Sequence, residues 1–254
     1  MQKDEIYQIN PKRQGLQILF GDDWKKWSYL QSQLSYVTPC HISVKISELA
    51  NHYYGKNSKN VWDMFGGLGM DAINLSNFFK TVIVTEIDQK VFQCLQNNIQ
   101  NVLFSPVNKL KDKDKNDDKN NDKDNKDKDK DKDKDKRKHS VSIEAYNQDA
   151  IQKLNDKKFM KAINLVYFDP PWGASFKTGE PFNFNNSIIT DSSGNEQNVI
   201  TLLNKLHDKV KNIIIKSPIL STSFEEWALQ KNIQIVQICE FPIHKLKYIF
   251  ISKE

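Results

Sequence analysis

Residues 61–69 read V-W-D-M-F-G-G-L-G, an apolar segment that runs directly into three closely spaced glycines. The apolar half is typical of a buried β-strand, and Gly66, Gly67 and Gly69 favour a tight turn into a helix. Glycines at such a junction let the backbone approach a bound molecule and leave amide N–H groups free to donate. A glycine-rich turn alone is weak evidence for a site, because many turns need glycine for a positive φ.

The segments on both sides of this stretch alternate between helix and strand patterns. Helices are expected over 42–50, 72–79, 91–99 and 151–159, with Thr38 as N-cap and Pro39 in the first turn of the first one. Strands are expected over 81–86, 140–146, 165–168, 210–216, 233–239 and 248–252, the last two as a closing pair. This alternation predicts an α/β fold with a mostly parallel sheet and helices on both faces.

Acidic residues follow two of these strands. Glu86 ends strand 81–86, about 20 residues beyond the glycines, where an acid can bind ribose hydroxyls. Asp88 is a second candidate for this role, or the N-cap of the next helix. Asp149, followed by Ala150, ends the turn after strand 140–146. In a sheet that binds a nucleoside, an acid at this position can accept a hydrogen bond from the adenine amino group. Asp149 can equally cap helix 151–159, and the two roles are compatible.

The stretch V-Y-F-D-P-P-W-G, residues 166–173, ends another expected strand. Asp169 can accept hydrogen bonds from an exocyclic amino group. Pro170 and the proline after it stiffen the turn and leave its carbonyls free to face a bound molecule. Trp172 offers a flat face on which a base can stack. The combination favours an enzyme that methylates a nucleobase amine; the alternative is a proline-rich turn with a core tryptophan.

In chain order, the glycine turn, the strand-end acids and D-P-P-W resemble the class I methyltransferases that depend on S-adenosylmethionine (SAM). The resemblance covers nearly all of residues 36–252. It implies a Rossmann-like, seven-stranded sheet whose last strand is antiparallel, with SAM as cofactor. The residues that it implies beside the cofactor are Asp63, Phe65, Gly66, Gly67, Gly69, Glu86, Asp88, Asp149, Ala150 and Asp169.

A closer resemblance rests on S-Y-V-T-P (Ser35–Pro39) before D-M-F-G-G-L-G, followed by E-I-D and P-P-W-G. This order is similar to the trimethylguanosine synthase family, whose members methylate the N2 amine of a 7-methylguanosine RNA cap. The resemblance implies that Val37, Thr38 and Pro39 complete the SAM pocket. It also implies that Trp172 stacks on the cap base, next to Asp169 and Pro170 at the reacting amine.

Two features depart from that family. Its members often have serine where Asp169 stands, and an acid is commoner in enzymes that methylate adenine or cytosine. They also tend to have an arginine that contacts cap phosphate just after the proline that follows the fifth strand. Here the run is I-K-S-P-I, and Lys216 is the candidate substitute, although lysine is a point charge and not a bidentate fork.

Composition divides the 254 residues into three parts. Residues 1–35 are expected to form an N-terminal extension, and 36–254 a methyltransferase domain. Within that domain, residues 109–138 are almost entirely Lys, Asp and Asn, which predicts a disordered insert. The net charge of +5 therefore comes partly from the insert and does not by itself indicate a basic groove.

Other compositional features limit partners and location. Three scattered cysteines favour an intracellular protein, in nucleus or cytoplasm, and neither they nor the histidines suggest a metal site. No apolar run predicts a membrane span. The expected partner is capped RNA or a cap nucleotide, and the expected state is a monomer. The alternatives are another nucleic-acid amino-methyltransferase, for example one acting on adenine N6, and a non-catalytic adaptor with the same fold.

Overall fold

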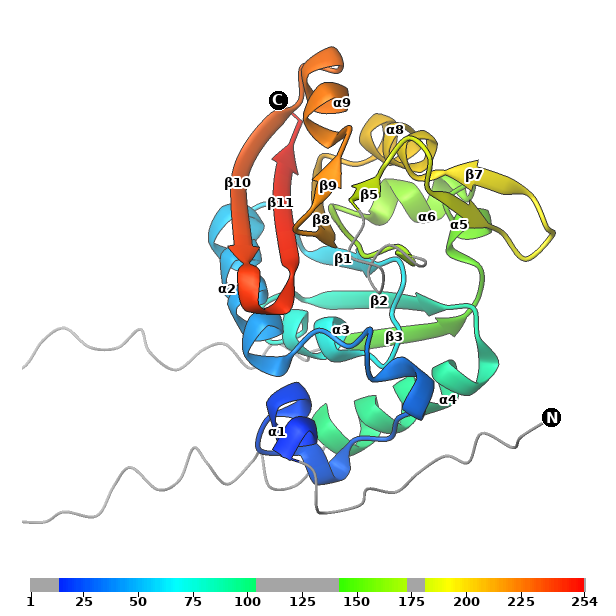
Figure 1. Cartoon of the computed structure of the whole chain (residues 1–254). Coiled ribbons are helices and arrows are strands. Elements are labelled where there is room, and N and C mark those ends of the chain that lie inside the picture. Colours follow the sequence, from blue (N-terminus) through cyan, green and yellow to red (C-terminus); the bar gives the residue numbers. More distant parts are fainter. Residues whose placement is uncertain (1–13, 104–141, 173–180, 254) are drawn as a thin grey trace, which may run out of the picture.

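A seven-stranded sheet forms the centre of the protein in the computed structural model, which describes residues 14–103, 142–172 and 181–253 (Figure 1). The strand order is β10-β11-β8-β4-β1-β2-β3. The strands are β1 (Asn60–Asp63), β2 (Thr81–Glu86), β3 (Ser142–Asn147), β4 (Leu165–Phe168), β8 (Asn212–Pro218), β10 (Gln234–Phe241) and β11 (Leu246–Ser252). Strands β3, β2, β1, β4 and β8 run parallel, and β11 is antiparallel to β8 and β10. The predicted fold class and antiparallel last strand are confirmed.

Helices cover both faces of the sheet because successive side chains of each central strand point to opposite faces. On β4, Tyr167 joins the core with α2 (Cys40–Tyr54), α3 (Met70–Leu75) and α4 (Gln89–Asn98). Phe168 joins the other core, with α5 (Ala150–Lys153), α6 (Lys157–Ala162), α8 (Val199–Lys209) and α9 (Phe224–Gln230). The carboxyl ends of the parallel strands therefore open between two helical layers.

The described part of the N-terminal extension packs into the first of these cores. It contains α1 (Gln14–Phe20) and two short 3-10 helices, η1 (Trp24–Lys26) and η2 (Gln31–Gln33), and α1 contacts α2. The rings of Phe20 and Trp27 stack with their centroids 5.0 Å apart. The extension is thus a structural part of the layer that covers this face.

One buried amide ties the extension to the glycine turn. Asn98 accepts a hydrogen bond from the Ser28 amide (2.6 Å) and donates to the carbonyls of Ser28 and Leu68, each at 2.9 Å. Its side chain is fully buried, so each of these groups would be left without a partner if the amide were removed.

Some local predictions are corrected. The helix expected over 151–159 is two helices, because Asp156 caps a new one by accepting hydrogen bonds from the amides of Lys158 and Phe159. Helix α4 continues into a π-helical turn, η3 (Ile99–Leu103). Short pairs β5 (Phe182–Asn183) with β9 (Ser221–Thr222), and β6 (Ile188–Thr190) with β7 (Glu196–Asn198), were not predicted. The insert at 109–138 lies outside the described residues. Within the described ranges, no helix is long and apolar enough to cross a membrane.

Asn98→Ala is expected to destabilise the protein by about 1–3 kcal/mol, because one buried and two partly buried backbone groups lose this partner. Urea denaturation followed by tryptophan fluorescence measures this change. Asn97→Ala is the matched control, since Asn97 is the preceding residue of the same helix and is exposed. Equal stability of the two variants would contradict the tie between extension and turn.

Candidate functional site

The glycine turn after β1 needs glycine for two different reasons. A side chain at Gly66 would overlap Val84, and one at Gly69, where φ is +89°, would overlap Leu95. Gly67 has a φ of +51° and open space around it. Packing against the next strand and helix therefore requires Gly66 and Gly69, whereas Gly67 presents backbone to an open cavity.

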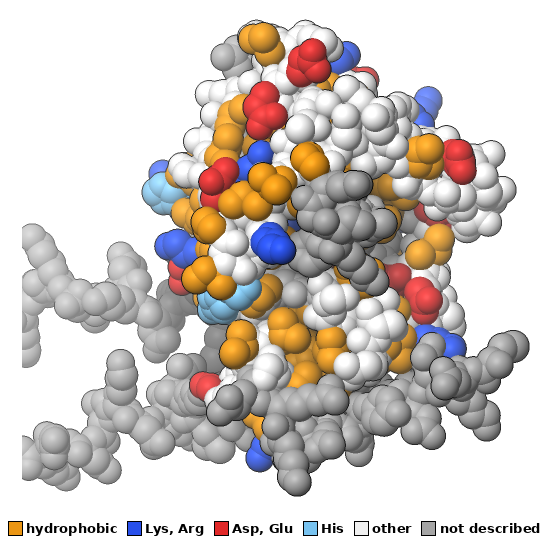
Figure 2. Space-filling view, viewed as in Figure 1, with side chains coloured by type: hydrophobic (Ala, Val, Ile, Leu, Met, Phe, Trp, Pro, Cys, Tyr) orange, Lys and Arg blue, Asp and Glu red, His pale blue; other side chains and the backbone are white. Residues whose placement is uncertain are grey.

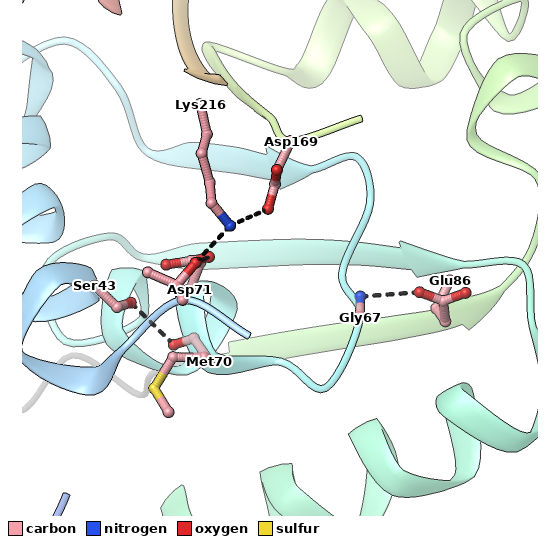
Figure 3. Close-up of polar contacts among 8 residues, drawn as sticks. Ser43, Gly67, Met70, Asp71, Glu86, Asp169 and Lys216 are labelled. Carbon is pink, nitrogen blue, oxygen red and sulfur yellow. Dashed lines mark hydrogen bonds and ion pairs between the residues drawn. The ribbon is translucent and has the colours of Figure 1, made fainter. Parts of the chain in front are cut away.

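Glu86, at the end of β2, is held by backbone amides beside this turn. Its carboxylate accepts hydrogen bonds from the amides of Gly67 (2.9 Å) and Asp88 (2.8 Å), the first of which is drawn in Figure 3. Burial raises the pKa of Glu86, and the hydrogen bonds from these amides act against that rise. Asp88 itself caps α4 by accepting from the amides of Lys90 and Val91, so its predicted capping role is confirmed.

Two adjoining cavities collect most of the predicted site residues at this edge of the sheet. The larger, of about 980 Å³, is lined among others by Val37, Phe65, Gly67, Glu86, Asp169, Pro170 and Trp172. A second, of about 420 Å³, shares Phe65 and Glu86 with it and reaches Asp149 and Ala150. Thr38, Asp63, Gly66, Gly69 and Asp88 line neither cavity. Pro39 and Lys216 line a third one, which is described below.

Asp149 is the N-cap of α5, as one of its two predicted roles requires. One carboxylate oxygen accepts a hydrogen bond from the amide of Ile151 (2.7 Å), and the other accepts from the amide of Ser192 (2.6 Å). The second contact joins α5 to the β6–β7 hairpin. A carboxylate can accept further hydrogen bonds beyond these two, so the capping role leaves room for a ligand contact.

A buried ion pair holds the acid of D-P-P-W. The Lys216 ammonium on β8 lies 2.6 Å from the Asp169 carboxylate and donates to the Thr38 hydroxyl at 2.9 Å. That hydroxyl donates in turn to Asp71 on α3 at 2.7 Å. Figure 3 shows Lys216, Asp169 and Asp71 converging at the ends of β4 and β8. The Lys216 side chain is only 3% exposed, and that of Asp169 is 16% exposed.

Two predictions are corrected by this cluster. Thr38 does not cap the first helix, because its hydroxyl is buried between Lys216 and Asp71; Pro39 occupies the N-cap position without a side-chain bond. Lys216 does not present its ammonium to solvent for a cap phosphate, because the ammonium is buried against Asp169 and Thr38.

Electrostatics link the members of the cluster. Burial raises the pKa of Asp169, and the charge of Lys216 acts against that rise. Desolvation alone would lower the pKa of Lys216, but the carboxylates of Asp169 and Asp71 outweigh it and raise this pKa. Asp63 is fully buried, and desolvation followed by repulsion from Asp71 and Asp169 raises its pKa well above the usual range. The Lys216 ammonium, together with a hydrogen bond from the Trp172 side chain, thus favours the charged form of Asp169.

Trp172 belongs to the core and to the cavity wall at once. It is 6% exposed, and its ring meets the edge of Phe182 with the ring centroids 4.9 Å apart. The same side chain lines the largest of the three cavities. Trp172 is therefore a buried tryptophan, as the core alternative predicts, and it also lines the cavity of the candidate site.

Asp71 is the member of the site that sequence reasoning missed. It stands two positions after Gly69, where an acid in the first turn of a helix is ordinary. Nothing in that position signals a buried partner from the V-T-P segment. No group of three or more His, Cys, Asp or Glu side chains in the described ranges is arranged to hold a metal ion.

Several solved structures with a similar fold are named as methyltransferases. A candidate methyltransferase from Porphyromonas gingivalis W83 matches with a TM-score of 0.51 and 14% identity, over 88% of this chain and 42% of that one. A T. thermophilus 16S rRNA N2 methyltransferase, in complex with AdoMet and guanosine, has a TM-score of 0.48 and 12% identity, over 86% and 44%. A SAM-dependent methyltransferase from Agrobacterium tumefaciens has a TM-score of 0.48 and 10% identity, over 86% of this chain and 63% of that one.

The first of these similarities shows a shared fold and nothing finer. No curated protein matches the sequence. A family model does match: the family described as RNA cap guanine-N2 methyltransferase aligns with residues 58–223, which is more than half of the chain. That span contains the glycine turn, Glu86, Asp149, D-P-P-W and Lys216. The chain therefore belongs to the RNA cap guanine-N2 methyltransferase family, and it is a class I methyltransferase that uses S-adenosylmethionine.

Proposed function

We propose that this protein transfers a methyl group from SAM to the exocyclic N2 amine of 7-methylguanosine in an RNA cap. The observation that carries the proposal is the shared cavity. Gly67 and Glu86, suited to a nucleoside, line the same space as Asp169, Pro170 and Trp172, which suit a base with an amino group. A donor and an acceptor can therefore meet there.

On the donor side, the Gly67 backbone approaches the ligand and Glu86 accepts hydrogen bonds from ribose hydroxyls. Asp149 and Ala150, in the adjoining cavity with Phe65, lie beside the adenine. Val37 closes the pocket from the V-T-P segment. Thr38 and Asp63 do not line this pocket; they support it through the buried cluster around Lys216 and Asp71.

On the acceptor side, the difficulty is that the lone pair of a guanine N2 amine is delocalised into the ring. SAM supplies a methyl group already activated on a sulfonium. Asp169 and the Pro170 carbonyl accept hydrogen bonds from the two amine N–H groups and so aim the nitrogen lone pair at that methyl. Positioning of this kind contributes several kcal/mol, up to about 7–11 in ideal cases. No residue is needed as a base, because water can take the proton after transfer.

Trp172 supplies the stacking face for the base. Stacking on an aromatic side chain contributes about 1–3 kcal/mol per base. A 7-methylguanine is cationic, and an indole face attracts a cation, which favours a cap over an ordinary guanine.

The function is tested with labelled SAM and three parallel substrates: 7-methyl-GTP, GTP and adenine-containing oligonucleotides. We expect label in 7-methyl-GTP alone. Label in adenine would replace the proposal by an amino-methyltransferase of another class. SAM binding without transfer to any of the three would favour a non-catalytic adaptor.

Lys216→Met is expected to shift the acid limb of the pH–kcat profile to higher pH. Asp169 accepts a hydrogen bond from the amine as a carboxylate. Activity therefore falls as pH drops through the pKa of Asp169 and the carboxylate is protonated. Without the ammonium, whose charge lowers this pKa, that fall begins at a higher pH. Lys216→Arg retains a charge and should restore part of the wild-type profile.

Lys211→Met is the matched control, because Lys211 is exposed directly before β8. Superimposable profiles of Lys216→Met and wild type would show that the ion pair does not set the charge of Asp169.

Trp172→Phe is expected to raise the KM for 7-methyl-GTP several-fold, because a smaller ring stacks less well, while the Kd for SAM stays close to wild type. Trp227→Phe is the control, since Trp227 is a buried tryptophan of the same core that lines none of the three cavities at the site. If both variants raised the KM equally, core packing and not stacking would explain the effect.

A further inference from the structure

A third cavity adjoins the proposed SAM site and has a different electrostatic character. Its volume is about 530 Å³, and it shares Tyr36, Val37 and Trp172 with the larger cavity. Its other lining residues are Leu19, Leu34, Ser35, Pro39, Lys216, His244 and Leu246. None of the described lining residues of this cavity is acidic, whereas the described residues of the other two cavities include Glu86 with Asp169 or Asp149. A negatively charged group is therefore better accommodated in the third cavity than in the other two.

A histidine pair lies at the rim of this third cavity. His244 ends the 3-10 helix η5 (Pro242–His244), between β10 and β11, and lines the cavity; His41 is in the first turn of α2. Their ring centroids are 5.1 Å apart. His41 is exposed and His244 half-buried, so both are accessible. Figure 2 shows histidine side chains among hydrophobic ones on this face.

The turn that carries His244 is anchored to the end of β8. The next residue, Lys245, has a φ of +54°, and its carbonyl accepts a hydrogen bond from the Ile219 amide at 2.9 Å. The exposed Lys245 side chain adds a positive charge beside the pair. Helix α2 begins at Cys40, so the positive end of its dipole lies at the same rim.

We propose that His41 and His244, assisted by Lys245, bind the 5′-phosphate chain of the capped substrate while its base occupies the space beside Trp172. This rests on the proposed function. Two adjacent imidazoles can each donate an N–H to phosphate oxygens, and Lys245 adds charge. The pair supplies the phosphate contact for which the buried Lys216 is not available.

The charge of the pair responds to phosphate. Burial, followed by repulsion from His41, lowers the pKa of His244. A bound phosphate favours the protonated imidazole of His244, so phosphate affinity should fall as pH rises and His244 loses its proton. The other charged groups on the adjoining elements are Lys45 and Glu48 on α2, Glu240 on β10, Lys247 on β11, Lys216 on β8, Lys245 in the turn, Lys25 and Lys26 on η1, and Asp22 and Asp23 before η1, both of which act on Cys40.

NMR titration of the histidines in the full chain tests the site. The probes are 7-methyl-GTP, inorganic triphosphate, and 7-methylguanosine, which lacks phosphate. We expect the first two to shift the His41 and His244 signals saturably and to raise the pKa of His244, with no shift from 7-methylguanosine. His52, exposed near the end of α2, is the internal control. Absence of a shift with both phosphate probes, or equal shifts at His52, overturns the proposal.

A double variant, His41→Ala with His244→Ala, gives a second measurement. The Kd for 7-methyl-GTP should rise about tenfold, while those for 7-methylguanosine and SAM stay constant. His52→Ala is the matched control. An equal rise in the Kd for 7-methylguanosine would assign the histidine pair to the base pocket and contradict the proposed phosphate site. Phosphate binding at the pair without methylation of 7-methyl-GTP would instead refute only the cap-methylation function.

Discussion

The site depends on one buried ammonium. Lys216 on β8 binds Asp169, which follows β4, and through Thr38 it reaches Asp71 on α3. Four segments that are far apart in sequence are thereby joined at the ends of the central strands. A buried charge without its partner typically costs about 3–5 kcal/mol, so the members of this chain of contacts constrain one another's positions. The proline-rich turn is held against the V-T-P segment by this constraint.

The packing of helices on both faces of the sheet explains why Lys216, Asp169 and Asp71 meet at the ends of β4 and β8. Alternate residues of β8 face opposite helical layers: Ile213 and Ile215 join one core, and Ile214 joins the other. Lys216 continues the second series, so its side chain points toward α2 and α3 and not toward solvent. The same alternation on β4 places Tyr167 toward the first layer, next to the buried acids. Strand geometry thus places the Lys216 ammonium in a buried space, where it binds the Asp169 carboxylate and the Thr38 hydroxyl.

Charge is distributed unevenly over the described residues that line the three cavities. The acids Glu86, Asp149 and Asp169 lie along the two cavities assigned to SAM and to the amine. The cavity beside them has His244 and no acid among its described lining residues; Lys216 also lines it, but its charge is paired with Asp169. Trp172 belongs to the wall of two of the three cavities.

The sequence by itself determined the α/β fold, the glycine turn, the strand-end acids Glu86 and Asp149, and the family. These follow from local patterns, since apolar periodicity and glycine requirements are set within a few residues. Only the tertiary structure decided that Lys216 is an internal partner of Asp169, that Thr38 bridges to Asp71, and that His41 meets His244. Such pairings join residues distant along the chain, and the direction of a charged side chain depends on which burial partners the packed layers bring to it.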